Sequence, residues 1–347
     1  MISEIGEECN MKRNILITLL LIGLAAVAEP IRIVTTTTDL ASIAKAIAGN
    51  LAQVDSIAGG REDPHDLTAR PSFITRASKA DLWIRVGLEL EIGWEPAVLR
   101  DARNRRIQVG ALGHLDCSEG ILPLDVPTGH FSRADGDVHP LGNPHYWLDP
   151  LNGRIIAKSI ANRLCNLYPE HKAVFEGNLK AFEERLDTRM FGTSLVAKVS
   201  GAKLWWLCEK GQLDDFLKQN HLEADAGGWY ASFLPYRGKW IATYHRSWTY
   251  LLKRFRLELA GEIEPKPGVP PSARHLTAIG RDFKAKGVKA ILQEPFYNSK
   301  AAERVAMACG AKVVIRANCT NGADGIDDYV SMLDSVLTGL CEAMEVR

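Results

Sequence analysis

Short apolar stretches of strand length alternate with longer amphipathic stretches from residue 31 onward. In the longer stretches the apolar positions recur every three or four residues, which is the spacing of one face of a helix. Strands alternating with helices are typical of a parallel sheet that helices cover on both faces. In the first half of the chain we predict a helix at 40–47 and strands at 31–34, 54–58, 80–86 and 106–110.

The middle of the chain differs, because residues 151–190 contain almost no strand pattern. Two helices are predicted there, at 152–168 and 170–190, with a break at Tyr168-Pro169. The second helix has apolar residues at helical spacing with charged residues between them. A long helix in this place would form a rigid connector between two lobes.

The alternating pattern then restarts. Strands are predicted at 203–208, 240–244, 257–263, 289–292 and 312–315, and helices at 247–255, 273–286, 301–309 and 327–344. The halves also share a weak likeness, since Val34-Thr35-Thr36 and Ala242-Thr243-Tyr244 each lead a strand into a helix. We therefore predict an α/β protein with two similar lobes and mainly parallel sheets. The predicted division is a first lobe at 29–168, a connecting helix at 169–195 and a second lobe at 196–347.

The N-terminal residues have the pattern of a secretory signal peptide. Met11-Lys12-Arg13 is basic, residues 15–27 are apolar, and Ala26-Val27-Ala28 has small residues where cleavage is expected. A membrane anchor is the alternative, but the apolar run is shorter than the ~20 residues that a bilayer span needs. No cysteine stands at the cleavage point, which argues against a lipid anchor. We predict that residues 1–28 are removed and that the protein is periplasmic.

Composition excludes some partners. The chain has 42 Lys and Arg against 42 Asp and Glu, so nothing in its charge indicates a nucleic acid or an anionic membrane. None of the cysteines in the exported part forms a CxxC pair, and disulfide pairing cannot be read from their spacing. We expect most of them to be small buried apolar residues.

Three of the nine histidines stand where predicted strands end or where loops lead into helices. His65 lies in Asp63-Pro64-His65-Asp66, His145 in the stretch NPHYWLDP, and His245 in TYHRSW. In open α/β sheets, ligands bind beyond the carboxyl ends of the strands. A single loop histidine is more often a surface or turn residue than a ligand, so each of the three would be weak evidence alone.

Five stretches carry a resemblance to the zinc- and manganese-specific solute-binding proteins of ABC importers, and the resemblance extends from about residue 31 to the C-terminus. It implies two α/β lobes joined by one long rigid helix, with the metal in the cleft between them. It further implies that His65 and His145 from the first lobe and His245 from the second bind the ion. The stretches are DPHDL at 63–67, GDVHPLGNPHYWLDP at 136–150, TYHRSW at 243–248, EIEPKPGVPPS at 262–272 and LQEPFYNSKAAERVA at 292–306.

The donor set favours one metal. Neutral imidazole suits zinc, whereas manganese sites take more carboxylate. Some members of the family carry Glu where this chain has His245. Three imidazoles therefore favour Zn²⁺ as the transported ligand, with Mn²⁺ as the alternative.

The fourth ligand is where this chain departs from the family pattern. Some members supply an Asp from the loop after the last strand of the second lobe, but the loop at 316–324 appears shortened and lacks an Asp at the expected place. The candidates are Glu294, Asp324, Cys319 or a water molecule, and we favour Glu294 or water. Glu294 can equally be a residue that orients a histidine.

Two further features have open interpretations. The segment 130–139 contains His130, Asp135, Asp137 and His139, and the resemblance implies a loop near this place that picks up metal before transfer. The segment is short, so it can equally be a solvated loop. Asp149 is predicted either to hold a histidine by a hydrogen bond or to cap the following helix.

The resemblance also predicts the partners of the protein. We expect a monomer that delivers its ion to the membrane permease of an importer and has no enzymatic activity. Three histidines and an open position also build a catalytic zinc site, so a zinc-dependent hydrolase is the alternative. The HExxH motif of many zinc hydrolases is absent from the sequence.

Overall fold

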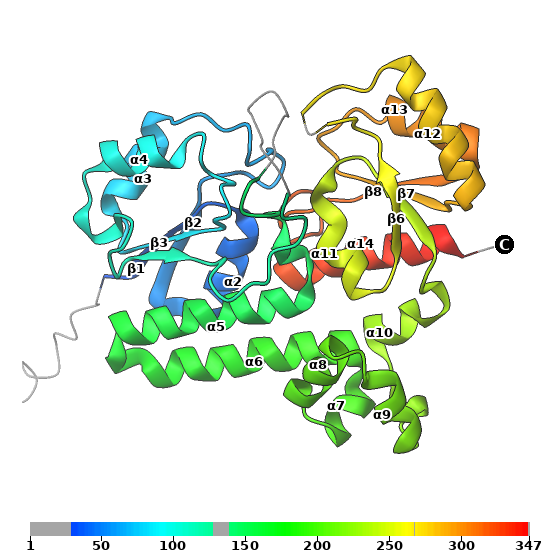
Figure 1. Ribbon diagram of the computed structural model, residues 1–347. Helices are drawn as coiled ribbons and strands as arrows, with labels where there is room; N and C mark the ends of the chain where they lie inside the picture. Colours follow the sequence, from blue (N-terminus) through cyan, green and yellow to red (C-terminus); the bar gives the residue numbers. More distant parts are fainter. Residues whose placement is uncertain (1–28, 128–138, 267, 346–347) are drawn as a thin grey trace, which may run out of the picture. The chain divides into compact units, whose positions relative to one another are not determined.

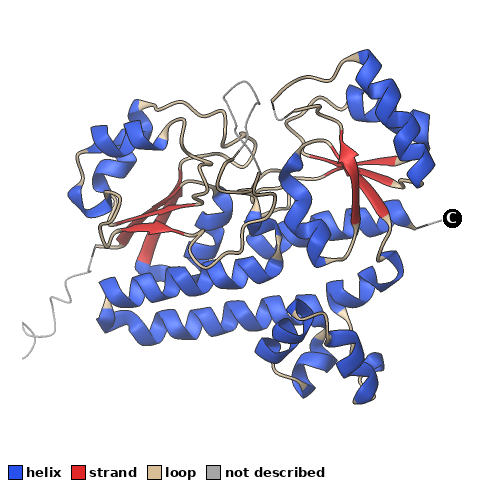
Figure 2. Cartoon of the chain, in the orientation of Figure 1, coloured by secondary structure: helices blue, strands red, loops and turns tan. Residues whose placement is uncertain are grey.

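Two four-stranded parallel sheets organise residues 29–127, 139–266 and 268–345, which the computed structural model describes (Figure 1). The predicted signal peptide and most of the segment 130–139 lie outside these residues. Figure 2 shows helices beside each sheet, as the alternating pattern predicts. The residues from Arg32 onward group as one unit, which contains both sheets. The predicted division of the chain into lobes and connector stays a prediction.

The first sheet has the strand order β2-β1-β3-β4. Strand β3 is central and pairs in parallel with β1 and β4, in the registers Ile33–Leu82 and Trp83–His114. Trp83 and Trp94 are fully buried in the hydrophobic core of this lobe. Its elements are β1 (Ile31–Thr35), α2 (Thr38–Ala48), β2 (Ala52–Ser56), α3 (Pro71–Lys79), β3 (Leu82–Arg85), α4 (Glu95–Ala102) and β4 (His114–Asp116).

The second sheet repeats this arrangement with the strand order β6-β5-β7-β8. In both sheets the second strand in sequence is the edge strand beside the first, and the third and fourth strands lie on the opposite side of the first. The weak internal likeness in the sequence thus corresponds to two lobes of the same topology. The elements are β5 (Trp240–Thr243), α11 (Thr249–Arg254), β6 (Glu258–Glu262), α12 (Ala273–Lys286), β7 (Ala290–Gln293), α13 (Lys300–Cys309), β8 (Lys312–Ile315) and α14 (Tyr329–Met344).

Two long helices, α5 (Pro150–Leu167) and α6 (Lys172–Phe191), run side by side below the sheets in Figure 1. They match the helices predicted at 152–168 and 170–190, with a short turn at Pro169–His171 between them. Four shorter helices follow before the second sheet begins: α7 (Thr193–Lys198), α8 (Gly201–Glu209), α9 (Leu213–Gln219) and α10 (Gly228–Phe233).

Two predicted strands are wrong. Residues 203–208 form part of helix α8, because a short apolar run does not distinguish a strand from a buried helix. Residues 106–110 begin in a tight turn, Arg105–Ile107, whose start is capped by the Asn104 side chain. The fourth strand of the first sheet, β4, comes a few residues later and is only three residues long.

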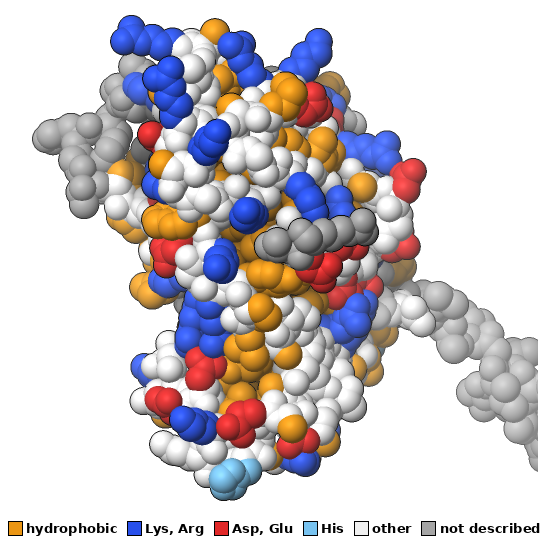
Figure 3. Space-filling model, turned by 90° about the vertical axis from the view of Figure 1, so that its right-hand side faces the viewer, with side chains coloured by type: hydrophobic (Ala, Val, Ile, Leu, Met, Phe, Trp, Pro, Cys, Tyr) orange, Lys and Arg blue, Asp and Glu red, His pale blue; other side chains and the backbone are white. Residues whose placement is uncertain are grey.

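The distribution of charge on the surface agrees with the balanced composition, but the burial of the cysteines differs from the prediction. On the face shown in Figure 3, acidic side chains lie between scattered basic ones. No helix among the described residues is long and apolar enough to cross a membrane. The described cysteines are all free, but only Cys117 and Cys319 are buried, so the expectation that most are buried is wrong.

Buried polar contacts join distant parts of the chain. The Oδ1 atom of Asp39, at the start of α2, accepts hydrogen bonds from the backbone N–H (2.9 Å) and the hydroxyl (3.0 Å) of Thr320. The indole N–H of Trp147 donates to the carbonyl of Asn318 at 2.9 Å. Both contacts connect the first half of the chain to the loop after β8. Burial raises the pKa of Asp39 to about 6, even though the hydrogen bonds from Thr320 oppose the shift.

This pKa predicts how stability depends on pH. In the unfolded chain Asp39 ionises near its ordinary value of 3.8, whereas in the folded protein it stays protonated up to about pH 6. The contribution of Asp39 to stability is therefore present at low pH and is lost as the pH rises through about 6. Asp39→Asn should remove this loss and gain up to about 2–3 kcal/mol relative to the parent between pH 4 and pH 7.

Urea unfolding at several pH values measures this difference. The same substitution at the exposed Asp215 is the control and should give a difference that does not change with pH. A flat difference for Asp39→Asn, or one that falls as the pH rises, would contradict the account.

Candidate metal centre

The three predicted histidines lie together between the two lobes. One ring nitrogen from each of His65, His145 and His245 lies within 4.8 Å of the others. The ring centroids are 5.1 Å apart for His65 and His145, 5.9 Å for His65 and His245, and 5.6 Å for His145 and His245. Among the described residues, this is the group of histidine, cysteine and acidic side chains with the geometry of a metal site. We refer to it as the triad.

Local sequence explains how two of these histidines are held. Asp63-Pro64-His65 and Asn143-Pro144-His145 have the same form, an Asx residue, a proline and a histidine. In both, the Asx side-chain oxygen accepts a hydrogen bond from the histidine backbone N–H at 3.0 Å. The same oxygen also contacts the Nδ1 atom of that histidine ring, at 2.7 Å for His65 and 2.9 Å for His145. A short segment thus fixes both the backbone and the ring.

His245 is held differently, by a residue from the neighbouring strand end. It follows β5, and its Nδ1 lies 2.7 Å from Oε2 of Glu264, which follows β6. Parallel pairing of β5 and β6 brings these two residues together. Each histidine of the triad therefore uses Nδ1 to donate to an oxygen. The lone pair of Nε2 in each ring is then the one that can bind a metal ion.

The pKa shifts indicate a neutral His145 beside an ionised Asp63. Burial, together with the neighbouring His65 and His245, holds the pKa of His145 well below its ordinary value. Burial opposes the ionisation of Asp63, but its hydrogen bonds to His65 and the nearby charges of His65 and His245 together lower the pKa of Asp63 to about 2. Burial lowers the pKa of His245, but the hydrogen bond to Glu264 and the charges of Glu294, Glu264 and Asp63 together raise it above its ordinary value.

Two further groups lie near the triad. Glu294, immediately after β7, has no exposed surface, and neither of its carboxylate oxygens has a hydrogen-bond partner in the described structure. Burial raises its pKa to about 7, against the opposing effect of His245. The Nε2 atom of His139 lies 3.1 Å from Nε2 of His65. Sequence reasoning placed His139 in a delivery loop and did not anticipate this contact.

The other candidates from the sequence have different surroundings. Asp324 has a fully exposed side chain and pairs with Arg61 at 2.6 Å. Cys319 is buried beside Asp39. Asp149 accepts from the backbone N–H of Leu151 and caps α5, so the capping alternative is confirmed. The prediction that Asp149 holds a histidine is wrong, because its carboxylate makes a two-fold ion pair with Arg254 instead.

Comparison with known proteins finds the same architecture. The sequence model of the family described as "Zinc-uptake complex component A periplasmic" matches residues 33–190 and 228–343. A crystal structure of ZnuA superimposes with a TM-score of 0.66 at 22% identity, covering 91% of this chain and all of that one. A manganese-bound periplasmic metal-binding protein from Candidatus Liberibacter asiaticus gives 0.65 at 17% identity, covering 90% of this chain and 99% of that one. At these identities the likeness shows the fold.

Relatives in sequence bear the names of different metals. The iron-binding protein YfeA of Yersinia pestis is 24% identical over 315 residues, which are 88% of this chain and 84% of that protein. The manganese ABC transporter substrate-binding lipoprotein scaA of Streptococcus gordonii is 31% identical over 185 residues, which are 50% of this chain and 56% of that protein. The chain thus matches only about half the length of this streptococcal relative.

The contact between the Glu264 carboxylate and Nδ1 of His245 can be tested by substitution. Glu264→Ala removes the group that orients His245 and should weaken zinc binding by about 10–100-fold. Glu262→Ala is the matched control, because Glu262 lies two residues earlier and pairs with Arg246 instead of a histidine. Competition with a zinc-binding dye measures both affinities. Equal affinities for the two variants would show that Glu264 does not support the site.

Proposed function

The chain belongs to the family of periplasmic zinc-uptake complex component A proteins, and we propose that it captures zinc and delivers it to the membrane permease of an ABC importer. Members of this family are extracytoplasmic solute-binding proteins and not enzymes, and capture of a divalent metal for import is their shared role. One observation carries the proposal: three imidazoles converge between the lobes, with one ring nitrogen of each within 4.8 Å of the others.

The choice of zinc rests on the donor set, because the relatives bear the names of iron, manganese and zinc. Imidazole suits zinc, whereas manganese favours carboxylate and water ligands. Among the described residues the clustered donors are all imidazoles, and the carboxylates of Asp63 and Glu264 contact the Nδ1 side of the rings. These features support a site with higher affinity for zinc than for manganese.

Glu294 or a water molecule would complete a tetrahedral site. Glu294 is buried without a hydrogen-bond partner in the described structure, so it has both oxygens free for an ion. Its oxygens are not among the donors that lie mutually within 4.8 Å, so binding would require Glu294 to move. His139 is a second candidate, because its Nε2 lies next to that of His65.

We also propose how the protein is located and how it works. Removal of residues 1–28 would release a periplasmic monomer. Its lobes, 29–168 and 196–347, would be joined rigidly through the helix at 169–195. Helices α5 and α6 pack side by side (Figure 1), which supports a stiff connector that limits the lobes to a small relative tilt. Ligands from both lobes would then couple metal release to that tilt.

Removing any one histidine of the triad tests the site. The variants His65→Ala, His145→Ala and His245→Ala should each weaken zinc binding by more than the 10–100-fold expected for loss of an orienting residue. His171→Ala is the control, because His171 lies half-buried in the turn between α5 and α6 and is not part of the triad. Titration with zinc, with manganese as competitor, provides the measurement. A folded His145→Ala protein with the parent affinity would overturn the site, and manganese outcompeting zinc would overturn the choice of metal.

The fourth position has its own test. If Glu294 binds the ion, Glu294→Gln should weaken equilibrium zinc affinity strongly, while His139→Ala changes only the rate of uptake. The reverse pattern would assign the fourth position to His139. Stopped-flow mixing gives the rates, and dye competition gives the affinities. Parent affinity in both variants would leave water as the ligand and would contradict the assignment to Glu294.

A further inference from the structure

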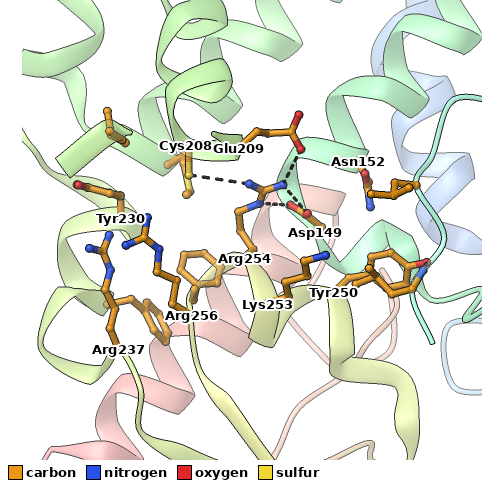
Figure 4. A pocket seen from close by; sticks show the side chains of 16 residues that line it. Asp149, Asn152, Cys208, Glu209, Tyr230, Arg237, Tyr250, Lys253, Arg254 and Arg256 are labelled. Carbon is orange, nitrogen blue, oxygen red and sulfur yellow. Dashed lines mark hydrogen bonds and ion pairs between the residues drawn. The ribbon is translucent and has the colours of Figure 1, made fainter. Parts of the chain in front are cut away.

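A cavity away from the triad has a charged lining (Figure 4). Its volume is about 260 Å³. Cys208, Glu209 and Leu213 on one wall come from residues 191–227, which lie between the two stretches that the family model matches. The opposite wall comes from α10 and α11 and the residues that follow them. The other lining residues lie within the matched stretches.

One part of the lining has more positive than negative charge. Arg237 and Arg256 donate to the same oxygen of Asp214, at 2.8 and 2.9 Å, and the hydroxyl of Tyr230 donates to the other oxygen. Figure 4 shows both guanidinium groups near Tyr230. A single carboxylate thus faces two guanidinium groups, each with five N–H donors. One positive charge and several donors remain available to a ligand.

The rest of the lining does not neutralise this excess. Both oxygens of Asp149 accept from Arg254 at 2.7 Å, and Glu209 lies 3.8 Å from the same guanidinium with 57% of its side chain exposed. Lys253 makes no hydrogen bond or ion pair with another described residue, and Figure 4 draws none for it. Together the basic side chains outnumber the acidic ones around the cavity.

Apolar side chains complete the lining and restrict the class of ligand. A bare inorganic anion would gain nothing from these surfaces, whereas an organic anion would bury its carbon skeleton on them. The guanidinium fork matches the two oxygens of a carboxylate. We propose that this cavity binds a small organic carboxylate. The apolar residues are Leu122, Leu124, Met190, Leu213, Phe233 and Phe255.

Benzoate is a suitable probe, with benzamide as its neutral analogue and sulfate as an inorganic anion. Isothermal titration of the metal-free full chain should show saturable benzoate binding at least tenfold tighter than that of benzamide or sulfate. Lys253→Met and Arg256→Met should each weaken benzoate binding several-fold. Arg105→Met, at an exposed position outside the cavity, is the control and should leave it unchanged.

Zinc affinity, measured on the same variants, separates this proposal from the proposed function. It should stay at the parent value in Lys253→Met, which shows that the protein is folded. Equal binding of benzoate and benzamide would overturn the proposal, as would equal binding of sulfate. Benzoate binding that neither Lys253→Met nor Arg256→Met changes would place the site elsewhere and would also overturn it.

Discussion

A side-chain oxygen holds the Nδ1 atom of each histidine in the triad, and the geometry of the site depends on these three contacts. They orient the rings so that one nitrogen of each lies within 4.8 Å of the others. For His65 and His145 the oxygen comes from two residues earlier, so a short loop fixes the ligand. For His245 it comes from Glu264, so the ligand is placed only once β5 and β6 have paired.

The fold explains why these loops meet. Both sheets have the same strand order, and His245 follows directly from the carboxyl end of a parallel strand. His145 lies just before α5, whose first turn is capped by Asp149. The ion pair between Asp149 and Arg254 ties this helix start to α11, the helix that follows His245. The segments that carry His145 and His245 are therefore also joined by this ion pair, outside the triad.

The sequence predicted the alternating α/β pattern, the two long helices and the three histidines that the structure brings together. It failed at residues 203–208, because a short apolar run fits a helix and a strand equally well. The repeated Asx-Pro-His pattern was visible in the sequence and could have identified Asp63 and Asn143 as orienting residues. The roles of Glu264 and His139 depend on which segments meet in space, and neither spacing nor composition contains that information.

X-ray absorption spectroscopy of the zinc-loaded protein tests the central claim most directly, because it reports the ligands around the ion itself. The account predicts at least three imidazole nitrogens at about 2.0–2.1 Å from zinc, and one fewer imidazole in each of the variants His65→Ala, His145→Ala and His245→Ala. A shell with fewer than three imidazoles in the parent, or a shell that is unchanged in those variants, would contradict it.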